Sequence, residues 1–393
     1  MHVCLATTHL LWNQGLGGHA WVFLNWALGL RAAGAKVTLY ERMRWADEPE
    51  RLLAHLRDFH QRMASLGLEI SITLLETSEQ AEELGGVRAE LSELTTPLEQ
   101  VMAESDLFLN FKYAVPQDIV DRFARSALVD IDPGLLQTWI DAGTVRPAVH
   151  DMNFSIGETV GLPDSRVPDC GMEWHFSPPP VYLPAWPVSD TPSDARFTTV
   201  TNWWGEYELI GGESVNNEKR TNFLAYIDLP SHTEAQLELA IYHEQGNPSD
   251  MPRLEKHGWH TRPAHEVSAS AEDYRSYLQT SRGEFSCAKQ SCMELANAWI
   301  SDRTICYLAS GKPAVVQHTG ESRFLPNAEG LFRFGSLAEA AGFLDLLSDE
   351  REYLSHCLAA RALVEQHFDA VRLMSSLLDV AMAQVPRRHN HAR

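Results

Sequence analysis

Three cations and a small-residue pair in the second half of the chain have the chemistry of a phosphate site. The cations are Arg282, Lys289 and Arg303, and the pair is Thr319-Gly320. Cations, a hydroxyl and bare backbone amides bind phosphate oxygens and stabilise negative charge on a departing phosphate. Because the net charge of the chain is −21, such a local basic cluster predicts an anion site. Arg303 could instead form an internal ion pair with Asp302, and the sequence leaves both interpretations open.

Two carboxylates in the first half have the spacing of an acid–base pair. Asp130 and Asp132 end an apolar run in the segment Asp130-Ile131-Asp132-Pro133-Gly134. Residues two apart in a strand point to the same side, so these carboxylates could share a proton, bind a cation or act as a general base. Asp-Pro-Gly is also a common turn sequence, which explains Asp132 but not Asp130.

A histidine in a glycine-rich loop is a third candidate for acid–base chemistry. His19 ends the segment Asn13-Gln14-Gly15-Leu16-Gly17-Gly18-His19. Gly17 and Gly18 allow the backbone to approach a ligand closely, which would aim His19 at an acceptor or at a phosphate. A plain capping role for His19 in the following helix is the alternative.

The elements that must position these residues alternate between strand and helix. In the first half, the pattern predicts strands over 2–8 and 36–40 with a helix over 20–31 between them. In the second half, residues 301–309 predict a helix, Gly311 ends it, and 314–316 form a buried strand. Thr319-Gly320 then follows the carboxyl end of that strand, where open α/β sheets bind ligands.

A proline-dense segment over 176–187 separates the two halves. We therefore predict an N-terminal domain over 1–185, a second domain over 186–370, and a last helix with a disordered tail over 371–393. Asn202 and Trp203 follow the first strand of the second domain, over 197–201. They are candidate ligand contacts at the cleft, or part of a packed domain interface.

Length and charge restrict the class of protein. A chain of 393 residues exceeds one typical domain. Its acidity argues against binding to nucleic acid or to anionic membranes, and no apolar run is long enough to span a bilayer. The six cysteines include no C-x-x-C pair, which favours free thiols in the cytoplasm. The sequence leaves the oligomeric state open, including a homodimer.

The βαβ opening also suits a nicotinamide dinucleotide enzyme. Glu41 closes the second predicted strand, where such an enzyme places the acid that binds the ribose. The strict G-x-G-x-x-G spacing is absent from this loop, which weighs against that interpretation.

Several motifs together resemble the GT-B glycosyltransferases, two-domain enzymes that move a sugar from a nucleotide diphosphate. Ala309-Ser310-Gly311-Lys312-Pro313 and then Thr319-Gly320 match the order of their donor half. A group of bacterial GT-B proteins is similar along nearly the whole chain. The matching segments are Asp130–Gln137, Cys170–Trp174, Thr198–Trp203, Glu284–Lys289 and Ser301–Ala309.

The resemblance implies an α/β fold with two Rossmann-like domains that face each other across a cleft, the C-terminal helix crossing back to the N-terminal domain. It implies a nucleotide-diphospho sugar donor, bound through Lys289, Arg303, Thr319 and Gly320, and a small metabolite or natural product as acceptor. Gly17, Gly18, Asn202, Trp203, Arg282 and Asp302 are further candidate donor contacts. Asp132, Asp130 or His19 would be the base. We expect neither a metal ion nor another cofactor.

One departure from the family concerns the stereochemistry. Retaining GT-B enzymes often carry Glu-x7-Glu across the key helix, whereas the two corresponding positions here hold Ala298 and Cys306. Glu321 or Asp302 would have to replace the missing ribose contact, and a single inverting displacement is favoured. The alternatives are a nucleotide-sugar epimerase or another two-domain nucleotide enzyme, and a non-catalytic sugar-nucleotide binding protein.

Overall fold

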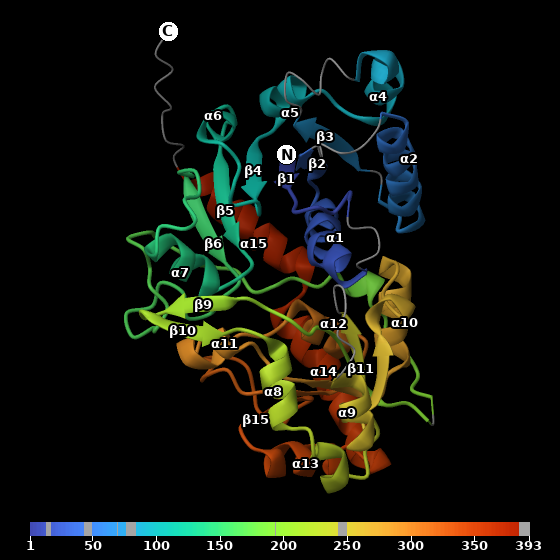
Figure 1. Ribbon diagram of the computed structural model, residues 1–393. Helices are drawn as coiled ribbons and strands as arrows, with labels where there is room; N and C mark the ends of the chain where they lie inside the picture. Colours follow the sequence, from blue (N-terminus) through green and yellow to red (C-terminus); the bar gives the residue numbers. More distant parts are fainter. Residues whose placement is uncertain are drawn as a thin grey trace.

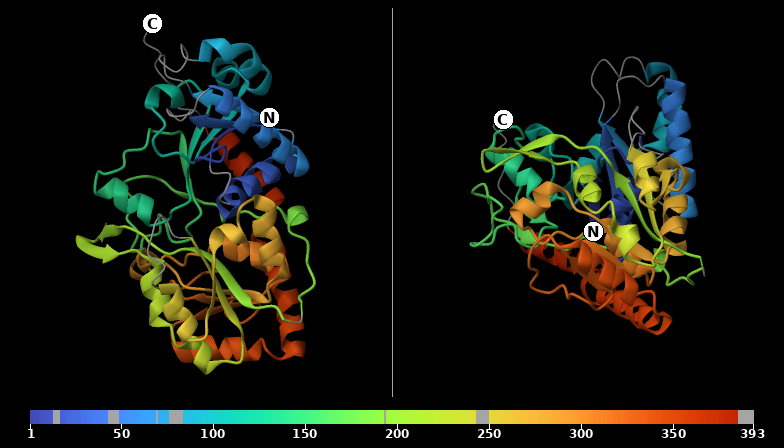
Figure 2. Two further views of the ribbon diagram at one scale, coloured as in Figure 1. Left: turned by 45° about the vertical axis from the view of Figure 1, so that its right-hand side comes forward. Right: turned by 60° about the horizontal axis from the view of Figure 1, so that its bottom comes forward.

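The computed structural model describes residues 1–12, 17–42, 49–68, 70–75, 84–192, 194–242 and 250–384. Two parallel sheets, each covered by helices, lie one above the other (Figure 1), and they stay separate in both further views (Figure 2). The predicted α/β class with two Rossmann-like units is confirmed. No helix among the described residues is long and apolar enough to cross a membrane.

Seven parallel strands form the first sheet, in the order β3-β2-β1-β4-β5-β6-β7. They are β1 (His2–Ala6), β2 (Lys36–Arg42), β3 (Ser71–Leu75), β4 (Leu107–Asn110), β5 (Ser126–Asp130), β6 (Met152–Ser155) and β7 (His175–Phe176). The helices are α1 (Gly17–Ala32), α2 (Pro49–Ser65), α4 (Arg88–Leu94), α5 (Leu98–Glu104), α6 (Gln117–Val120) and α7 (Leu135–Asp141), with a 3₁₀ turn at Leu84–Val87. Every residue of β1, β4 and β5 is buried, as expected for parallel strands covered on both faces.

Six parallel strands form the second sheet, in the order β12-β11-β8-β13-β14-β15. They are β8 (Phe197–Asn202), β11 (Leu237–Tyr242), β12 (His260–Pro263), β13 (Gly283–Ser286), β14 (Ala314–Gln317) and β15 (Leu331–Phe334). Its longer helices are α8 (Lys219–Ala225), α9 (Asp250–Lys256), α10 (Ala271–Thr280), α11 (Gln290–Leu295), α12 (Asp302–Ala309), α13 (Leu337–Leu346) and α14 (Glu350–His367). Ser336 caps α13, its hydroxyl oxygen accepting from the backbone N–H of Glu339.

The last helix, α15 (Ala370–Ala383), returns to the first sheet and packs against α1 (Figure 1). Where the chain crosses back, it is tied to the linker by two backbone hydrogen bonds. Val181 donates its N–H to Phe368 at 2.8 Å, and Ala370 donates to Val181 at 3.0 Å. Gly29 of α1 lets the two helices touch, because a Cβ there would lie 2.8 Å from the Cβ of Ala370. The predicted return of the C-terminal helix is confirmed.

A hairpin of β9 (Tyr207–Ile210) and β10 (Glu213–Asn216) leaves the second sheet and is among the elements that the sequence analysis did not predict. Gly211 and Gly212 form its turn with φ of 59° and 86°, the positive pair that a two-residue hairpin turn requires. The hairpin contacts helix α7 of the first half, since the indole N–H of Trp139 donates to Glu208 at 2.7 Å. Part of the predicted glycine-rich loop, residues 13–16, and the tail over 385–393 lie outside the described residues.

Candidate functional site

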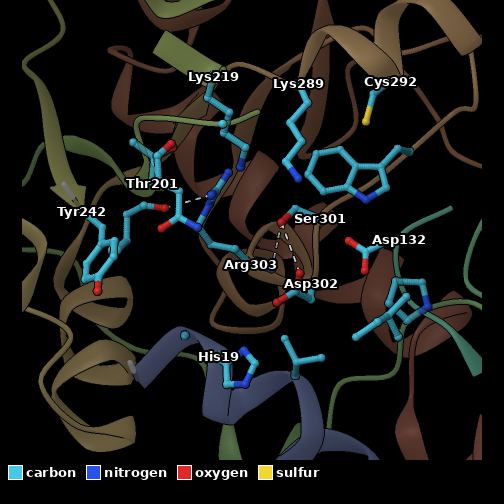
Figure 3. Close-up of a pocket in the computed structure, with 18 of the residues that line it drawn as sticks. His19, Asp132, Thr201, Lys219, Tyr242, Lys289, Cys292, Ser301, Asp302 and Arg303 are labelled. Carbon is cyan, nitrogen blue, oxygen red and sulfur yellow. Dashed lines mark hydrogen bonds between the residues drawn. The ribbon is translucent and has the colours of Figure 1, made fainter. Parts of the chain in front are cut away.

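A cavity of about 540 Å³ lies between the two sheets, at the carboxyl ends of their strands (Figure 3). Its lining comes from both halves of the chain. The first half contributes one face of α1, the turn after β5 and the residue after β6. These residues include Gly18, His19, Val22, Trp26, Ile131, Asp132, Leu135 and Ile156. The second half contributes Asn202, Trp204, Glu206, Lys219, Tyr242, Ser268, Lys289, Trp299, Ser301, Asp302 and Arg303, among others.

The N-terminus of α12 points into this cavity. Ser301 is its N-cap, with the hydroxyl oxygen accepting from the backbone N–H of Arg303 at 3.2 Å. Ile305, Leu308 and Ala309 of the same helix are fully buried, so the apolar spacing fixes the helix against the core while its first turn stays at the cavity. The free N–H groups and partial positive charge of such a terminus favour a bound anion.

Three cations line the cavity, but one of them is already paired. Arg303 is 7% exposed and donates to the fully buried carboxylate of Glu284 at 2.7 Å and to the carbonyl of Val200 at 2.9 Å. Within the described parts of the chain, no carboxylate lies within ion-pair distance of Lys219 or Lys289. Their side chains extend from the same side of the cavity in Figure 3. Lys219 and Lys289 are therefore the charges available to a ligand.

The environment of Lys219 makes its charge sensitive to pH. It begins α8, and its ammonium group lies 5.7 Å from the centre of the Trp299 ring. Burial, together with the charges of the neighbouring Arg303 and Lys289, lowers the pKa of Lys219 to about 7. A bound anion would compensate both effects.

Asp132 and Asp130 have different environments despite their spacing. Asp132 lines the cavity, and its Oδ2 accepts from the hydroxyl of Tyr113 at 3.3 Å. Asp130 is fully buried and accepts from Ser155 at 2.6 Å, from Gln137 at 2.8 Å and from the backbone N–H of Asp132 at 2.9 Å. Burial raises the pKa of Asp130 to about 6. Asp130 holds the turn, and only Asp132 is presented to the cavity.

His19 faces the cavity with one ring nitrogen committed. Its Nε2 donates to the carbonyl of Thr8, which leaves Nδ1 as the nitrogen that can accept a proton. Burial lowers the pKa of His19, and the nearby Asp302 carboxylate opposes this shift. Burial likewise raises the pKa of Asp302, against the effect of Arg303, Lys219 and His19. Both groups thus favour their neutral forms more than they would in water.

Comparison with known proteins gives a structural likeness alone. No family model matches the chain, and no curated protein matches it. HepE from Anabaena, in complex with UDP-glucose, has 12% identity and a TM-score of 0.55, covering 98% of this chain and 100% of its own. A glycosyltransferase from Rickettsia africae has 10% identity and a TM-score of 0.56, covering 97% and 98%. AviGT4, involved in avilamycin A biosynthesis, has 13% identity and a TM-score of 0.53, covering 97% of each chain.

This chain has the GT-B fold. The resemblance stated from the motifs is confirmed for the fold. The cavity between its two parallel sheets is the GT-B cleft, and several predicted site residues line it. They are Gly18, His19, Asp132, Asn202, Lys289, Asp302 and Arg303.

Arg282 lies away from the GT-B cleft, which corrects the expectation that it faces a diphosphate. It immediately precedes β13 and is therefore at the amino end of the strand, whereas the cavity is at the carboxyl ends. Its guanidinium donates to the carbonyl of Leu347 at 2.8 Å and stacks 4.0 Å from the ring centre of Tyr353.

Thr319, Gly320 and Glu321 also do not line the cleft. The Thr319 hydroxyl donates to the carbonyl of Trp299 at 2.9 Å, and Gly320 packs so closely that a Cβ would lie 2.5 Å from the carbonyl oxygen of Ala296. Thr319 and Gly320 thus contact the loop over 296–300 and stabilise its position. The Glu321 side chain is 91% exposed.

Trp203 lies in the hydrophobic core of the second half, which corrects both the ligand-contact and the domain-interface interpretation. It is 2% exposed, stacks on Phe223 and donates its indole N–H to Asp250 at 2.9 Å. The next residue, Trp204, lines the cleft in its place and is 40% exposed, with the Arg220 guanidinium over its ring.

Gly17 packs against the second half of the chain, whereas the sequence predicted a contact with the ligand. It donates its N–H to the carbonyl of Ser268 at 2.9 Å, and it lies against the start of α10. A Cβ at this position would lie 2.0 Å from the carbonyl oxygen of Ser270. The glycines at the start of α1 therefore let the two halves of the GT-B fold approach each other.

Gly17→Ala is expected to lower the free energy of unfolding by about 1–3 kcal/mol, because the added methyl group must displace backbone. Chemical denaturation would measure this. Gly342→Ala is the matched control: Gly342 is exposed in α13 with no atom within 4 Å of an added Cβ, and alanine there should stabilise by up to about 1 kcal/mol. Equal stability of the Gly17→Ala variant and the wild type would contradict the close packing.

Several cleft residues were not predicted from the sequence. They are Lys219, Trp204, Glu206, Tyr242, Ser268, Trp299 and Ser301. Among the described residues, no group of three or more His, Cys, Asp or Glu side chains is arranged to hold a metal ion.

Proposed function

We propose that this chain is a glycosyltransferase. It moves a sugar from a nucleotide-diphospho sugar to a hydroxyl group of a small metabolite or natural product. The observation that carries the proposal is the content of one cavity: Lys219 and Lys289, which have no ion-pair partner among the described residues, and the carboxylate of Asp132 from the opposite half of the chain. The likeness to HepE, solved with UDP-glucose, and to AviGT4 supports a nucleotide-sugar donor and a natural-product acceptor.

On the donor side, Lys219, Lys289 and the N-terminus of α12 neutralise the diphosphate. Arg303 contributes through its fixed charge, although Glu284 offsets part of it. Preformed positive groups of this kind stabilise the charge that develops on the leaving nucleotide, so the reaction requires no metal ion.

On the acceptor side, the cavity wall is apolar around one carboxylate. Val22, Trp26, Leu135 and Ile156 suit a scaffold with apolar surface, and Asp132 lies among them. Asp132 accepts the proton of the acceptor hydroxyl while the oxygen of that hydroxyl bonds to the sugar carbon. The bond from the same carbon to the diphosphate breaks in this step. His19, with Nδ1 available, is the second candidate base.

The proposed outcome is inversion in a single displacement. The family position for the ribose-binding glutamate holds Cys306, which is 2% exposed and lies against the amide of Asn25. Asp302, at the cavity, is the carboxylate left for the ribose, because Glu321 is turned to solvent.

All six cysteines are free, which supports a reducing compartment such as the cytoplasm.

A thermal-shift screen with UDP-, GDP-, dTDP- and ADP-sugars tests the proposal. A donor present at about 100 times its dissociation constant should add about 2.7 kcal/mol of stability. Release of free nucleotide only when acceptor is added would then favour transfer over epimerisation. A protein that is stabilised by none of these donors would overturn the proposal.

A further inference from the structure

The loop between α11 and α12 has a strained backbone where it borders the cleft. Ala296 and Ala298 have φ of 46° and 53°, in the left-handed region that residues with a Cβ rarely adopt. Such strain persists only where the surroundings enforce it, and it concentrates at functional sites. Here Thr319 accepts from the N–H of Ala298 at 3.0 Å, and Gly320 packs against Ala296.

Asn297, between the two strained alanines, is fully buried and joins the two halves of the chain. Its Nδ2 donates to the carbonyl of Pro133 at 2.9 Å, and its Oδ1 accepts from the backbone N–H of Trp299 at 3.2 Å. Gly134 has φ of 92° and leaves room for this approach, since a Cβ there would lie 2.6 Å from Leu295 and 3.4 Å from the Asn297 amide nitrogen.

Each of the two hydrogen bonds ends beside a cleft group. Pro133 follows Asp132, so the first bond fixes the turn that presents the carboxylate. Trp299 lies under the ammonium group of Lys219, so the second bond fixes the ring on which the cation rests. A single amide therefore spans from the acceptor side of the cavity to its donor side.

We propose that Asn297 is a positioning residue that holds Asp132 and Lys219 at a fixed separation. The inference rests on the proposed transfer reaction. Asn297 itself is not among the residues that line the cavity, so it would act through its neighbours. Its role is to place the proton acceptor in line with the donor, because a displacement of about 1 Å in such an arrangement can reduce a rate by about 10²-fold.

Two variants separate this role from simple loss of a contact. Asn297→Leu has similar size and removes both hydrogen bonds. Asn297→Asp keeps the oxygen that accepts from Trp299, but it can donate to Pro133 only when its carboxyl group is protonated. Ser322→Ala is the control, because it removes a different hydrogen bond between the two halves, the one to Glu158 at 2.6 Å.

The test measures UDP-glucose affinity by titration calorimetry and UDP-glucose hydrolysis by water, as the transfer reaction that needs no known acceptor. We expect Asn297→Leu to keep the affinity within about threefold, because a small shift of Lys219 leaves its charge in the cavity. The hydrolysis rate should fall about 10²-fold, because it depends on the exact separation of Lys219 and Asp132. Asn297→Asp should recover activity as the pH is lowered, relative to wild type. Ser322→Ala should hydrolyse at the wild-type rate.

The outcomes distinguish the inference from the proposed function. Wild-type protein that neither binds nor hydrolyses UDP-glucose, or any other donor of the screen, contradicts the proposed function, and the role of Asn297 falls with it. Wild-type protein that does both, together with an Asn297→Leu variant that keeps its rate or loses affinity and rate equally, overturns the inference alone. The same holds if Asn297→Asp shows the wild-type pH profile.

Discussion

Asp132→Asn is expected to lower the rate of sugar transfer by a factor of about 10²–10⁴, the usual contribution of a positioned general base. The amide has the shape of the carboxylate and still accepts from Tyr113, but it cannot take a proton from the acceptor. Because the lysines that bind the diphosphate come from the other sheet, the affinity for donor should change by less than about threefold. Steady-state kinetics with the nucleotide sugar that stabilises the protein most would separate the two effects.

Asp164→Asn is the matched control, an exposed carboxylate of the same half that does not line the cleft. It should keep the wild-type rate. An Asp132→Asn variant with an unchanged rate would remove Asp132 as the base. His19→Gln would then be the next variant to test, because Nδ1 of His19 is another proton acceptor at the cavity.

The fold was predictable from the sequence because its signals are local. Apolar runs of four to six residues separated by helices specify a parallel α/β sheet, and β5, β8 and β14 appear where these runs predict them. The missed hairpin also carried a signal, Gly211-Gly212 between two alternating segments. Its two strands have four residues each and contain no buried residue, so they lack the apolar run that marks strands such as β5 and β14.

The site was harder to predict because it depends on which end of a strand each residue occupies and which way a turn rotates. Arg282 and Lys289 lie on either side of β13, so one is at the amino end and the other at the cleft. Trp203 and Trp204 are adjacent, and only the rotation after β8 decides that the second faces the cavity. Lys219 comes close because the hairpin folds back, an arrangement that no local pattern reveals.

Lys219 is expected to make donor binding depend on pH. Only the protonated ammonium attracts a diphosphate, and burial with the neighbouring cations lowers the pKa of Lys219 to about 7 in the free protein. As the pH rises above that value, the protonated fraction falls about tenfold per unit, so the affinity for UDP-glucose should weaken towards pH 9. The diphosphate of UDP-glucose stays ionised throughout, which makes it a better probe than UDP.

Two variants at this position test the assignment. Lys219→Met removes the charge at every pH, and losing a hydrogen bond to a charged group should cost about 1.5–3 kcal/mol, or roughly 10- to 150-fold in affinity near pH 6. Lys219→Arg keeps a charge that does not titrate, so its affinity should vary little between pH 6 and 9. Equal pH profiles for the wild type and the arginine variant would show that another group titrates.

Proton uptake gives an independent check on the same charge. The anion restores the ordinary pKa of the lysine by offsetting the burial and the repulsion from Arg303 and Lys289. Binding near pH 8 must then draw a proton from the buffer, so the calorimetric enthalpy should change with the ionisation enthalpy of that buffer. The Met and Arg variants should lose this dependence for opposite reasons, since one has no proton to gain and the other already holds it. A dependence that persists in both variants would assign the proton to a different residue.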